Sequence, residues 1–354
     1  MKALRFHGRR DLRVEDVPDP SSLGADQLIV KPSVCGICGT DLHEYAAGPL
    51  IVPTAPHVFT GAKLPQILGH EFAGEVVEVG ADVTHVRRGD RVSIQPQVFP
   101  ADDYYARRGL GHLSDRNATI GLSWGWGGMG QYAVVNGYNA TRLPHDVDDV
   151  QGAMIEPAAV AVYAVERGRV TPGSTVLVAG GGPIGVLTAM AAQLAGAARV
   201  YVSEPNAARR AAIETLDLGL ACLDPGESDM LAALKRGTED GVGVDVAFEC
   251  VGNERAFETC VSAVRRRGTV VQVGLHLGRA SVEPTVWALK DISIEGVVCY
   301  PVTIWPRMIR LIQSGRFPVE RLVSTRVPLE SAVQDGFAPL LGGKTAALKI
   351  LIEL

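Results

Sequence analysis

The stretch Val176-Leu-Val-Ala-Gly-Gly-Gly-Pro-Ile-Gly185 joins an apolar run to a glycine-rich turn. The apolar run predicts a buried strand, and the Ala-rich segment from Val186 to Gly196 predicts a helix. In such a unit Gly180 permits a tight turn, Gly182 lets the backbone approach a pyrophosphate, and Gly185 lets the helix pack on the strand. The stretch therefore predicts a dinucleotide-binding βα unit.

An acidic residue ends the next predicted strand, nineteen positions after Gly185. This residue, Glu204, stands where a carboxylate binds the adenosine ribose and repels a 2′-phosphate, so we expect NAD rather than NADP. Arg209 and Arg210 follow closely enough to weaken that preference. The alternative is a glycine-rich loop that only turns the chain. The predicted cofactor-binding residues are Gly180, Gly182, Pro183, Ile184, Gly185, Glu204 and Arg209.

Apolar runs alternate with helix-like segments from about residue 151 onward. The predicted strands are Ser174 to Ala179, Arg199 to Ser203, Ala221 to Leu223, Val244 to Glu249, Thr269 to Val273 and Ile292 to Cys299. A helix is predicted after each of the first five. Such a βα series indicates a doubly wound parallel sheet covered on both faces.

The first 150 residues have a different pattern, in which short apolar runs are separated by Gly, Pro and Asp. The predicted strands there are Met1 to Phe6, Arg13 to Val17, Gln27 to Val34, Phe72 to Val79, Arg91 to Pro96 and Gln131 to Asn136. This half is expected to be β-rich and barrel-like. The last part of the chain predicts helices around 304–314 and 329–341 and a closing strand, Ala347 to Ile352, that returns to the first half.

Composition excludes several classes of protein. The chain has 354 residues and a net charge of −5, without the basic excess of a nucleic-acid or anionic-membrane partner. No apolar run approaches the ~20 residues of a membrane span, and the start lacks the apolar segment of a signal peptide. Six cysteines are too few for a disulfide framework. We expect a cytoplasmic protein.

A second stretch, Cys35-Gly-Ile-Cys-Gly-Thr-Asp-Leu-His-Glu-Tyr45 with Gly69-His-Glu71, collects polar side chains. It supplies thiols, imidazoles, a hydroxyl and carboxylates, which is the ligand chemistry of a catalytic zinc. Cys35-x-x-Cys38 alone also fits a redox dithiol or half of a zinc knuckle, but no thioredoxin-like βαβ unit surrounds it and no second C-x-x-C follows. Unrelated polar loop residues are the remaining alternative.

The order Cys38-Gly-Thr-Asp-Leu-His43, Gly69-His-Glu71 and Glu156-Pro157, with the dinucleotide turn downstream, resembles the zinc-dependent medium-chain alcohol dehydrogenases. The resemblance runs essentially from end to end. It implies an α/β protein with a GroES-like β-rich catalytic domain at 1–155, a Rossmann NAD-binding domain at 156–297, and a return to the catalytic domain at 298–354.

The resemblance also assigns roles to residues. It implies that Cys38 and His70 bind Zn²⁺, with Glu156 as the third ligand and Glu71 as its alternate. Asp41 would orient the zinc-bound histidine. The implied catalytic residues are Cys38, Thr40, His43, His70, Glu71 and Glu156, with Thr40 and His43 as the proton relay. Cys35 matches no ligand and is expected to be a small buried residue.

Within the family the likeness is greatest to butanediol dehydrogenases, followed by sorbitol dehydrogenases. It rests on Asp41-Leu-His-Glu-Tyr45, Gly48-Pro-Leu-Ile-Val-Pro53, Gly61-Ala-Lys-Leu-Pro-Gln-Ile-Leu-Gly-His-Glu-Phe72, Glu156-Pro-Ala-Ala-Val160 and Val202-Ser-Glu-Pro205. It implies hydride transfer between a small vicinal diol and NAD, with zinc as Lewis acid. The alternatives are a polyol or cyclitol substrate, L-threonine 3-dehydrogenase activity, and a non-catalytic NAD-binding structural protein. A homodimer or homotetramer is expected, paired through the predicted edge strand at 293–299.

The chain departs from the family at a second, structural zinc site. The four positions that hold cysteines in many members are Pro100, Asp103, Ala106 and Ser114 here. We therefore predict one catalytic zinc, no structural zinc, and a lobe held by its own packing. Trp124-Gly-Trp126 is unfamiliar at this point. Either Trp124, Tyr45 and Phe59 line the substrate pocket, or the tryptophans pack against their own lobe.

Overall fold

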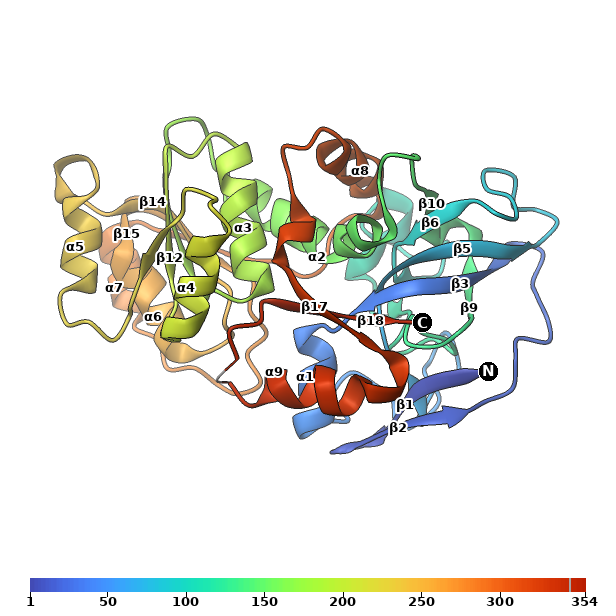
Figure 1. Ribbon diagram of the computed structural model, residues 1–354. Helices are drawn as coiled ribbons and strands as arrows, with labels where there is room; N and C mark the ends of the chain where they lie inside the picture. The colour runs from blue at the N-terminus through green and yellow to red at the C-terminus, as the bar shows by residue number, and fades with distance from the viewer. Residues whose placement is uncertain (344) are drawn as a thin grey trace. The chain divides into compact units, whose positions relative to one another are not determined.

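Residues Pro157–Tyr300 form one of two structural units, and Met1–Glu156 with Pro301–Leu354 form the other. The structure is a computed structural model that describes residues 1–343 and 345–354 (Figure 1). The last part of the chain thus belongs to the same unit as the first half.

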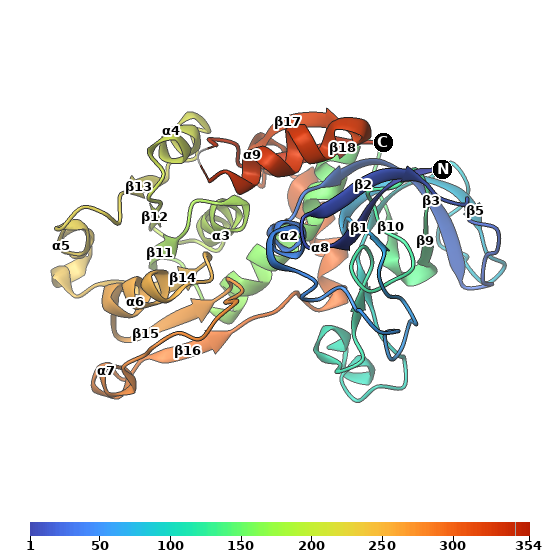
Figure 2. The same ribbon diagram turned by 90° about the horizontal axis from the view of Figure 1, so that it is seen from below.

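The unit Pro157–Tyr300 is built on a parallel six-stranded sheet in the order β13-β12-β11-β14-β15-β16. Its strands are β11 (Thr175–Ala179), β12 (Arg199–Ser203), β13 (Ala221–Leu223), β14 (Val244–Glu249), β15 (Val264–Gln272) and β16 (Ser293–Gly296). The strand order reverses between β11 and β14, which is the switch point where doubly wound sheets bind ligands. Figure 2 shows β16 beside β15, and β16 is the edge strand. The prediction of a Rossmann sheet is confirmed.

Helices follow the first five strands, again as predicted. They are α3 (Pro183–Leu194), α4 (Ala207–Thr215), α5 (Met230–Arg236), α6 (Glu254–Ala263) and α7 (Pro284–Lys290). The central strand β11 is covered on both faces, so Val176, Leu177 and Val178 are all fully buried. The predicted strand at 269–273 is longer, because β15 begins at Val264 and contains a register shift against β14.

The other unit contains a seven-stranded sheet in the order β10-β6-β5-β3-β18-β17, with β9 also paired to β3. Its strands are β3 (Gln27–Gly36), β5 (Glu71–Val79), β6 (Arg91–Ile94), β9 (Ala133–Asn136), β10 (Ala140–Arg142), β17 (Val323–Pro328) and β18 (Lys349–Glu353). Ile352 pairs with Cys35, so the closing strand lies next to the strand that leads to the predicted metal ligands.

Smaller elements complete this unit. They are β1 (Lys2–Gly8), β2 (Asp11–Asp16), β4 (Gln66–Ile67), β7 (Gln97–Val98), β8 (Ala118–Thr119), α1 (Gly39–Ala47), α8 (Trp305–Gln313) and α9 (Ala338–Leu341). The predicted helix at 329–341 is divided into short 3₁₀, π and α segments. Among the described residues, no helix combines the length and apolar character that crossing a membrane requires.

The helix α2 (Asp149–Arg167) carries Glu156 and has no counterpart in the predictions. Its interior proline, Pro157, argues against a helix at this position. Its start is nevertheless well marked, because Asp148 and Gln151 exchange hydrogen bonds between side chains and backbone N–H groups at 2.8 and 3.1 Å. This reciprocal cap is the sequence signal that would have revealed the helix.

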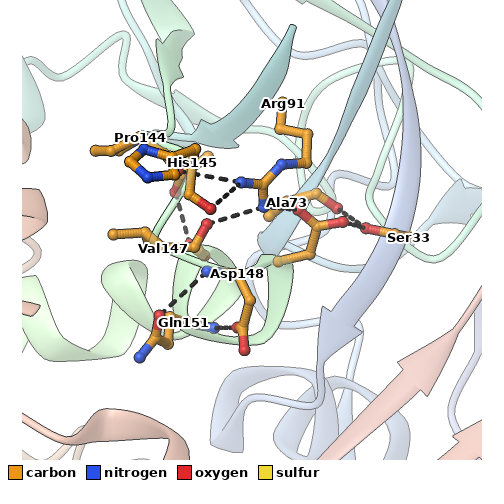
Figure 3. Close-up of polar contacts among 11 residues, drawn as sticks. Ser33, Ala73, Arg91, Pro144, His145, Val147, Asp148 and Gln151 are labelled. Carbon is orange, nitrogen blue, oxygen red and sulfur yellow. Dashed lines mark hydrogen bonds and ion pairs between the residues drawn. The ribbon is translucent and has the colours of Figure 1, made fainter. Parts of the chain in front are cut away.

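Arg91 ties the start of α2 to the sheet (Figure 3). Its guanidinium donates to the carbonyl oxygens of Pro144, His145 and Val147, and to Asp149 Oδ1 at 3.2 Å. Ser33 on β3 donates to the other carboxylate oxygen of Asp149 at 2.6 Å. Asp149 and Glu156 are two helical turns apart and project from the same side of α2, so this network fixes the helix face that presents Glu156.

The lobe that lacks the four cysteines is held by local contacts. Asp103 accepts a hydrogen bond from the Tyr105 amide at 2.8 Å, and Arg108 stacks over the Tyr104 ring at 3.7 Å. Gly111 lies so close to the Phe99 ring that a side chain would not fit. His112 is buried here, and burial lowers its pKa to about 4.

Candidate metal centre and nucleotide-binding turn

The chain turns from β3 into α1 at Cys38, which is the N-cap residue of the helix. The Cys38 backbone N–H donates to Asp41 Oδ2 at 2.9 Å, and this bond fixes the first helical turn. The Cys38 thiol lies 3.7 Å from the Thr40 hydroxyl oxygen. The local sequence Cys-Gly-Thr-Asp therefore presents a sulfur and a hydroxyl at one place.

Three metal-ligating side chains meet at this point. Potential ligand atoms of Cys38, His70 and Glu71 all lie within 4.8 Å of one another. His70 immediately precedes β5, and Glu71 is its first residue, so the sheet brings both beside the end of β3. Sulfur, imidazole and carboxylate together suit zinc. Among the described residues this is the one group of three or more such side chains.

Asp41 stands behind His70. The distance from its Oδ1 to His70 Nδ1 is 3.7 Å, both atoms are buried, and neither has a hydrogen-bond partner in the described structure. Burial raises the pKa of Asp41 to about 6. Burial disfavours charged His70, but the negative charges of Cys38 and Asp41 outweigh that and raise its pKa above the usual value. With Nδ1 facing Asp41, Nε2 is the nitrogen left for a metal, so these residues fit the ion.

Glu156 lies outside this three-residue group. It is buried on α2, and its charge contributes to the raised pKa of His70, so it is near the centre. The family resemblance implies Glu156 as third ligand and Glu71 as its alternate, whereas the structure brings Glu71 into the tight cluster. Thr40 and His43 are spaced three residues apart on α1 and share a helix face. His43 Nδ1 is buried and has no hydrogen-bond partner in the described part of the chain.

Lys349 is a residue of this site that sequence reasoning did not find. It is the first residue of β18 and only 1% exposed. Its Nζ forms an ion pair with Glu71 and donates to the Ile37 carbonyl oxygen at 2.9 Å. The signal in the sequence was a lone lysine in the otherwise apolar run Leu348 to Ile352.

The tryptophans pack against the core of the unit that contains them, which is neither the pocket nor the lobe alone. Trp124 donates its indole N–H to the Val134 carbonyl oxygen at 2.8 Å, and Trp124 and Trp126 both pack against the hydrophobic core. Tyr45 packs edge-on against Phe337, with ring centroids 6.0 Å apart. Cys35 is fully buried, as predicted.

The nucleotide turn lies at the carboxyl end of β11. Gly180 has φ +105°, a conformation that favours glycine, and Gly182 caps α3 with Pro183 as its first residue. A Cβ on Gly185 would lie 1.8 Å from the Gly180 carbonyl oxygen, whereas a Cβ on Gly182 would meet no atom within 4 Å. Helix and strand are therefore in close contact at Gly185, and the backbone at Gly182 faces open space that suits a pyrophosphate.

Glu204 is buried directly beside this turn. Its carboxylate accepts hydrogen bonds from the Gly181 amide at 2.9 Å and the Asn206 amide at 2.8 Å. Arg209 lies 3.4 Å from the same carboxylate. Arg210 instead binds the Glu204 carbonyl oxygen and the carboxylate of Asp224. The predicted cofactor residues are thus brought together, and Gly181 and Asn206, which the sequence did not single out, hold the acid in place.

Comparison with known proteins matches both units. The sequence model for the alcohol dehydrogenase GroES-like domain matches residues 24–145, and that for zinc-binding dehydrogenases matches residues 183–314. The chain is 34% identical to (R,R)-butanediol dehydrogenase of Bacillus subtilis, covering 100% of this chain and 99% of the relative. It is also 34% identical to human sorbitol dehydrogenase, covering 99% of this chain and 95% of the relative. The chain belongs to the zinc-dependent alcohol dehydrogenase family.

Solved structures of this dehydrogenase family agree. The crystal structure of 2R,3R-butanediol dehydrogenase from Bacillus subtilis superposes with a TM-score of 0.92 at 34% identity, covering 100% of this chain and 99% of that one. A putative zinc-binding dehydrogenase from Sinorhizobium meliloti, solved with NADP, gives a TM-score of 0.88 at 30% identity. The match covers 100% of this chain and 99% of that one. The protein is therefore an oxidoreductase that uses zinc and a nicotinamide cofactor.

Proposed function

We propose that this dehydrogenase oxidises a small vicinal diol of the 2,3-butanediol type to an α-hydroxyketone, with NAD as hydride acceptor, and that it also catalyses the reverse reduction. The observation that carries the proposal is the cluster of Cys38, His70 and Glu71 within 4.8 Å of one another. Butanediol dehydrogenases from two bacteria, at 34% and 32% identity over the whole chain, support the choice of substrate. The sorbitol dehydrogenases at similar identity make a longer polyol the second candidate.

Cys38 and His70 would hold a single catalytic zinc, and a carboxylate from Glu156 or Glu71 would be the third ligand. When bound, the zinc supplies Lewis-acid chemistry that makes an alcohol easier to deprotonate. Asp41 orients His70. Thr40 would take up the alcohol proton and pass its own proton on toward His43, and a nicotinamide held at the glycine turn would serve as the hydride acceptor. Each turnover thus converts an alcohol and NAD into a carbonyl compound, NADH and a proton.

The turn at Gly180, Gly182, Pro183, Ile184 and Gly185 binds the pyrophosphate at the start of α3. Glu204 hydrogen-bonds the adenosine ribose and repels a 2′-phosphate, which favours NAD. Arg209 is 3.4 Å from Glu204 and lowers the strength of this preference. In this proposal Glu204→Ala weakens NAD binding and narrows the preference for NAD over NADP.

The catalytic domain of this proposal comprises 1–155 and 298–354, and the NAD domain comprises 156–297. The enzyme works in the cytoplasm as a homodimer or homotetramer, with the edge strand β16 as the pairing surface. The structure contains six free cysteines, which is compatible with a reducing compartment.

A substrate panel tests the proposal. The purified chain is assayed with 2,3-butanediol stereoisomers, sorbitol and L-threonine, each with NAD and NADP, before and after chelation. We expect the highest kcat/KM for a butanediol isomer with NAD, loss of activity with the chelator, and recovery with Zn²⁺. A preference for sorbitol or L-threonine would reject the diol assignment. Cofactor binding without turnover of any alcohol would favour a non-catalytic protein.

A further inference from the structure

Glu249 and His276 form a polar contact that takes no part in the proposed proton or hydride transfer. Glu249 ends β14 and is fully buried, whereas His276 follows the end of β15 and its side chain is 14% exposed. The distance from His276 Nε2 to Glu249 Oε2 is 3.3 Å. Because a carboxylate oxygen is an acceptor, the ring nitrogen is the donor in this contact. Carboxylates are rarely buried to this extent without partners, so the partners of Glu249 indicate what it does.

The Glu249 carboxylate shapes the loop that follows β14. Its Oε1 accepts hydrogen bonds from the Val251 and Gly252 amides at 2.8 and 2.7 Å. Val251 is 45% exposed and lies beside the nucleotide turn, since a Cβ on Gly180 would be 2.8 Å from Val251 Cγ2. Glu249 therefore sets the position of an exposed apolar side chain next to that turn.

The loop that follows β15 packs tightly against the first loop. The Glu249 carbonyl oxygen accepts hydrogen bonds from the Val273 and Gly274 amides at 2.8 and 2.9 Å. A Cβ on Gly252 would lie 2.3 Å from the Leu275 carbonyl oxygen, so the two backbones are in close contact. Leu275 is 47% exposed and is the apolar side chain that this second loop presents to solvent beside the first. The two loops are thus joined through the backbone of Glu249 and, at its side chain, through the histidine.

Strand order indicates which half of a dinucleotide reaches these two loops. In the proposed function the turn after β11 binds the pyrophosphate, and Glu204 after β12 binds the adenosine ribose. β14 lies on the other side of β11 from β12, and β15 lies beyond β14. A dinucleotide bound across the carboxyl ends of these strands therefore extends its nicotinamide half over the ends of β14 and β15.

We propose that His276 is a positioning residue for the nicotinamide half of the cofactor. By bonding Glu249 Oε2, it holds the loop after β15 to the loop after β14 and so fixes Val251 and Leu275 on the path of that half. This inference rests on the proposed function for the places of the pyrophosphate and the adenosine ribose. It does not depend on which alcohol is oxidised.

Calorimetry with NAD and with ADP tests the proposal on the full chain. ADP retains the adenosine and both phosphates but lacks the nicotinamide and its ribose. His276→Leu removes the donor and keeps an apolar side chain beside Phe257, whose ring lies edge-on to the imidazole with centroids 6.5 Å apart. We expect the NAD affinity to fall on the order of tenfold and the ADP affinity to stay within a factor of about two.

Three further variants complete the test. His276→Asn carries a donor too short to reach Glu249 and should show the same selective loss of NAD affinity, so it replaces His276→Leu if that variant does not fold. His276→Gln has an N–H donor at a similar reach and should keep the wild-type affinity for both ligands. His7→Leu is the matched control, because His7 Nε2 lies 3.2 Å from Glu15 Oε1 in the other unit. It should change neither affinity.

Wild-type NAD affinity in His276→Leu and His276→Asn overturns the role of His276. So do equal losses for NAD and ADP, because that result means a purely structural histidine, and so does a loss in His276→Gln as large as in His276→Leu. These outcomes leave the proposed function intact if the wild-type protein binds both ligands. A wild-type protein that binds neither NAD nor ADP overturns both.

Discussion

Replacing Gly185 by alanine tests the nucleotide turn. The new Cβ would lie 1.8 Å from the Gly180 carbonyl oxygen and 2.9 Å from its carbon, whereas real Cβ contacts stay beyond 3.0 Å. The start of α3 or the Gly180 peptide must therefore move by about 1.2 Å. Overpacking of this kind costs about 1–3 kcal/mol, which lowers the thermal midpoint by about 2–4 °C per kcal/mol in a unit of this size. A displacement of about 1 Å at a binding site can weaken function on the order of 100-fold.

The assay is NAD affinity by calorimetry together with the thermal midpoint, for Gly185→Ala and two matched variants. In Gly182→Ala the Cβ meets no protein atom within 4 Å, so we expect unchanged stability but weakened NAD binding, because the methyl group occupies the space meant for the pyrophosphate. Gly278→Ala, also without neighbours, should change neither quantity. NAD affinity that stays at the wild-type value in both Gly185→Ala and Gly182→Ala would refute the reasoning.

Three further substitutions test other parts of the structure. Arg91→Met removes four hydrogen bonds at the start of α2 and should lower the free energy of unfolding by about 2–3 kcal/mol. It should also weaken zinc binding roughly tenfold, because Glu156 is carried by the same helix. Unchanged zinc affinity in a competition titration would disprove this link. The pKa of His112 falls from 6.5 to about 4 on folding, because the buried site disfavours the charged imidazole. The free energy of unfolding is therefore unaffected by this group above pH 6.5, and about 3 kcal/mol of it is lost as the pH falls to 4. The thermal midpoint of His112→Gln should decline less than that of the wild type over this range, and equal slopes would contradict this. Trp124→Ala removes the indole donor to the Val134 carbonyl oxygen and the contacts with the core. It should lower the free energy of unfolding, measured with urea, by about 2–3 kcal/mol and leave the ranking of substrates unchanged. An altered ranking would indicate that Trp124 lines the substrate pocket.

Much of the Rossmann unit could be predicted from sequence because its strands are short apolar runs with clear ends. The strands at 199–203, 221–223 and 244–249 have the predicted bounds. The start of β15 could not be predicted in the same way, because Val264 is separated from the apolar run by three arginines and a register shift. The helix α2 was not predicted, although a reciprocal cap at Asp148 and Gln151 marks its start, and the interior Pro157 is the residue that argues against a helix there.

In the candidate metal site, too, some residues could be placed from local sequence and others could not. Cys38, Thr40, Asp41 and His43 lie within six residues, so local sequence is enough to place them together. Which carboxylate completes the set depends on contacts between distant strands. The partner of Glu71 is Lys349, 278 residues away, and no local pattern reports such a pairing.

The most direct test of the account is the zinc content of the purified chain and of its Cys38→Ala and His70→Ala variants, measured by mass spectrometry alongside diol oxidation with NAD. The account predicts one zinc per wild-type chain, and both variants folded, without zinc and without activity. Wild-type zinc content in both variants, or full activity in a metal-free wild-type chain, would contradict it.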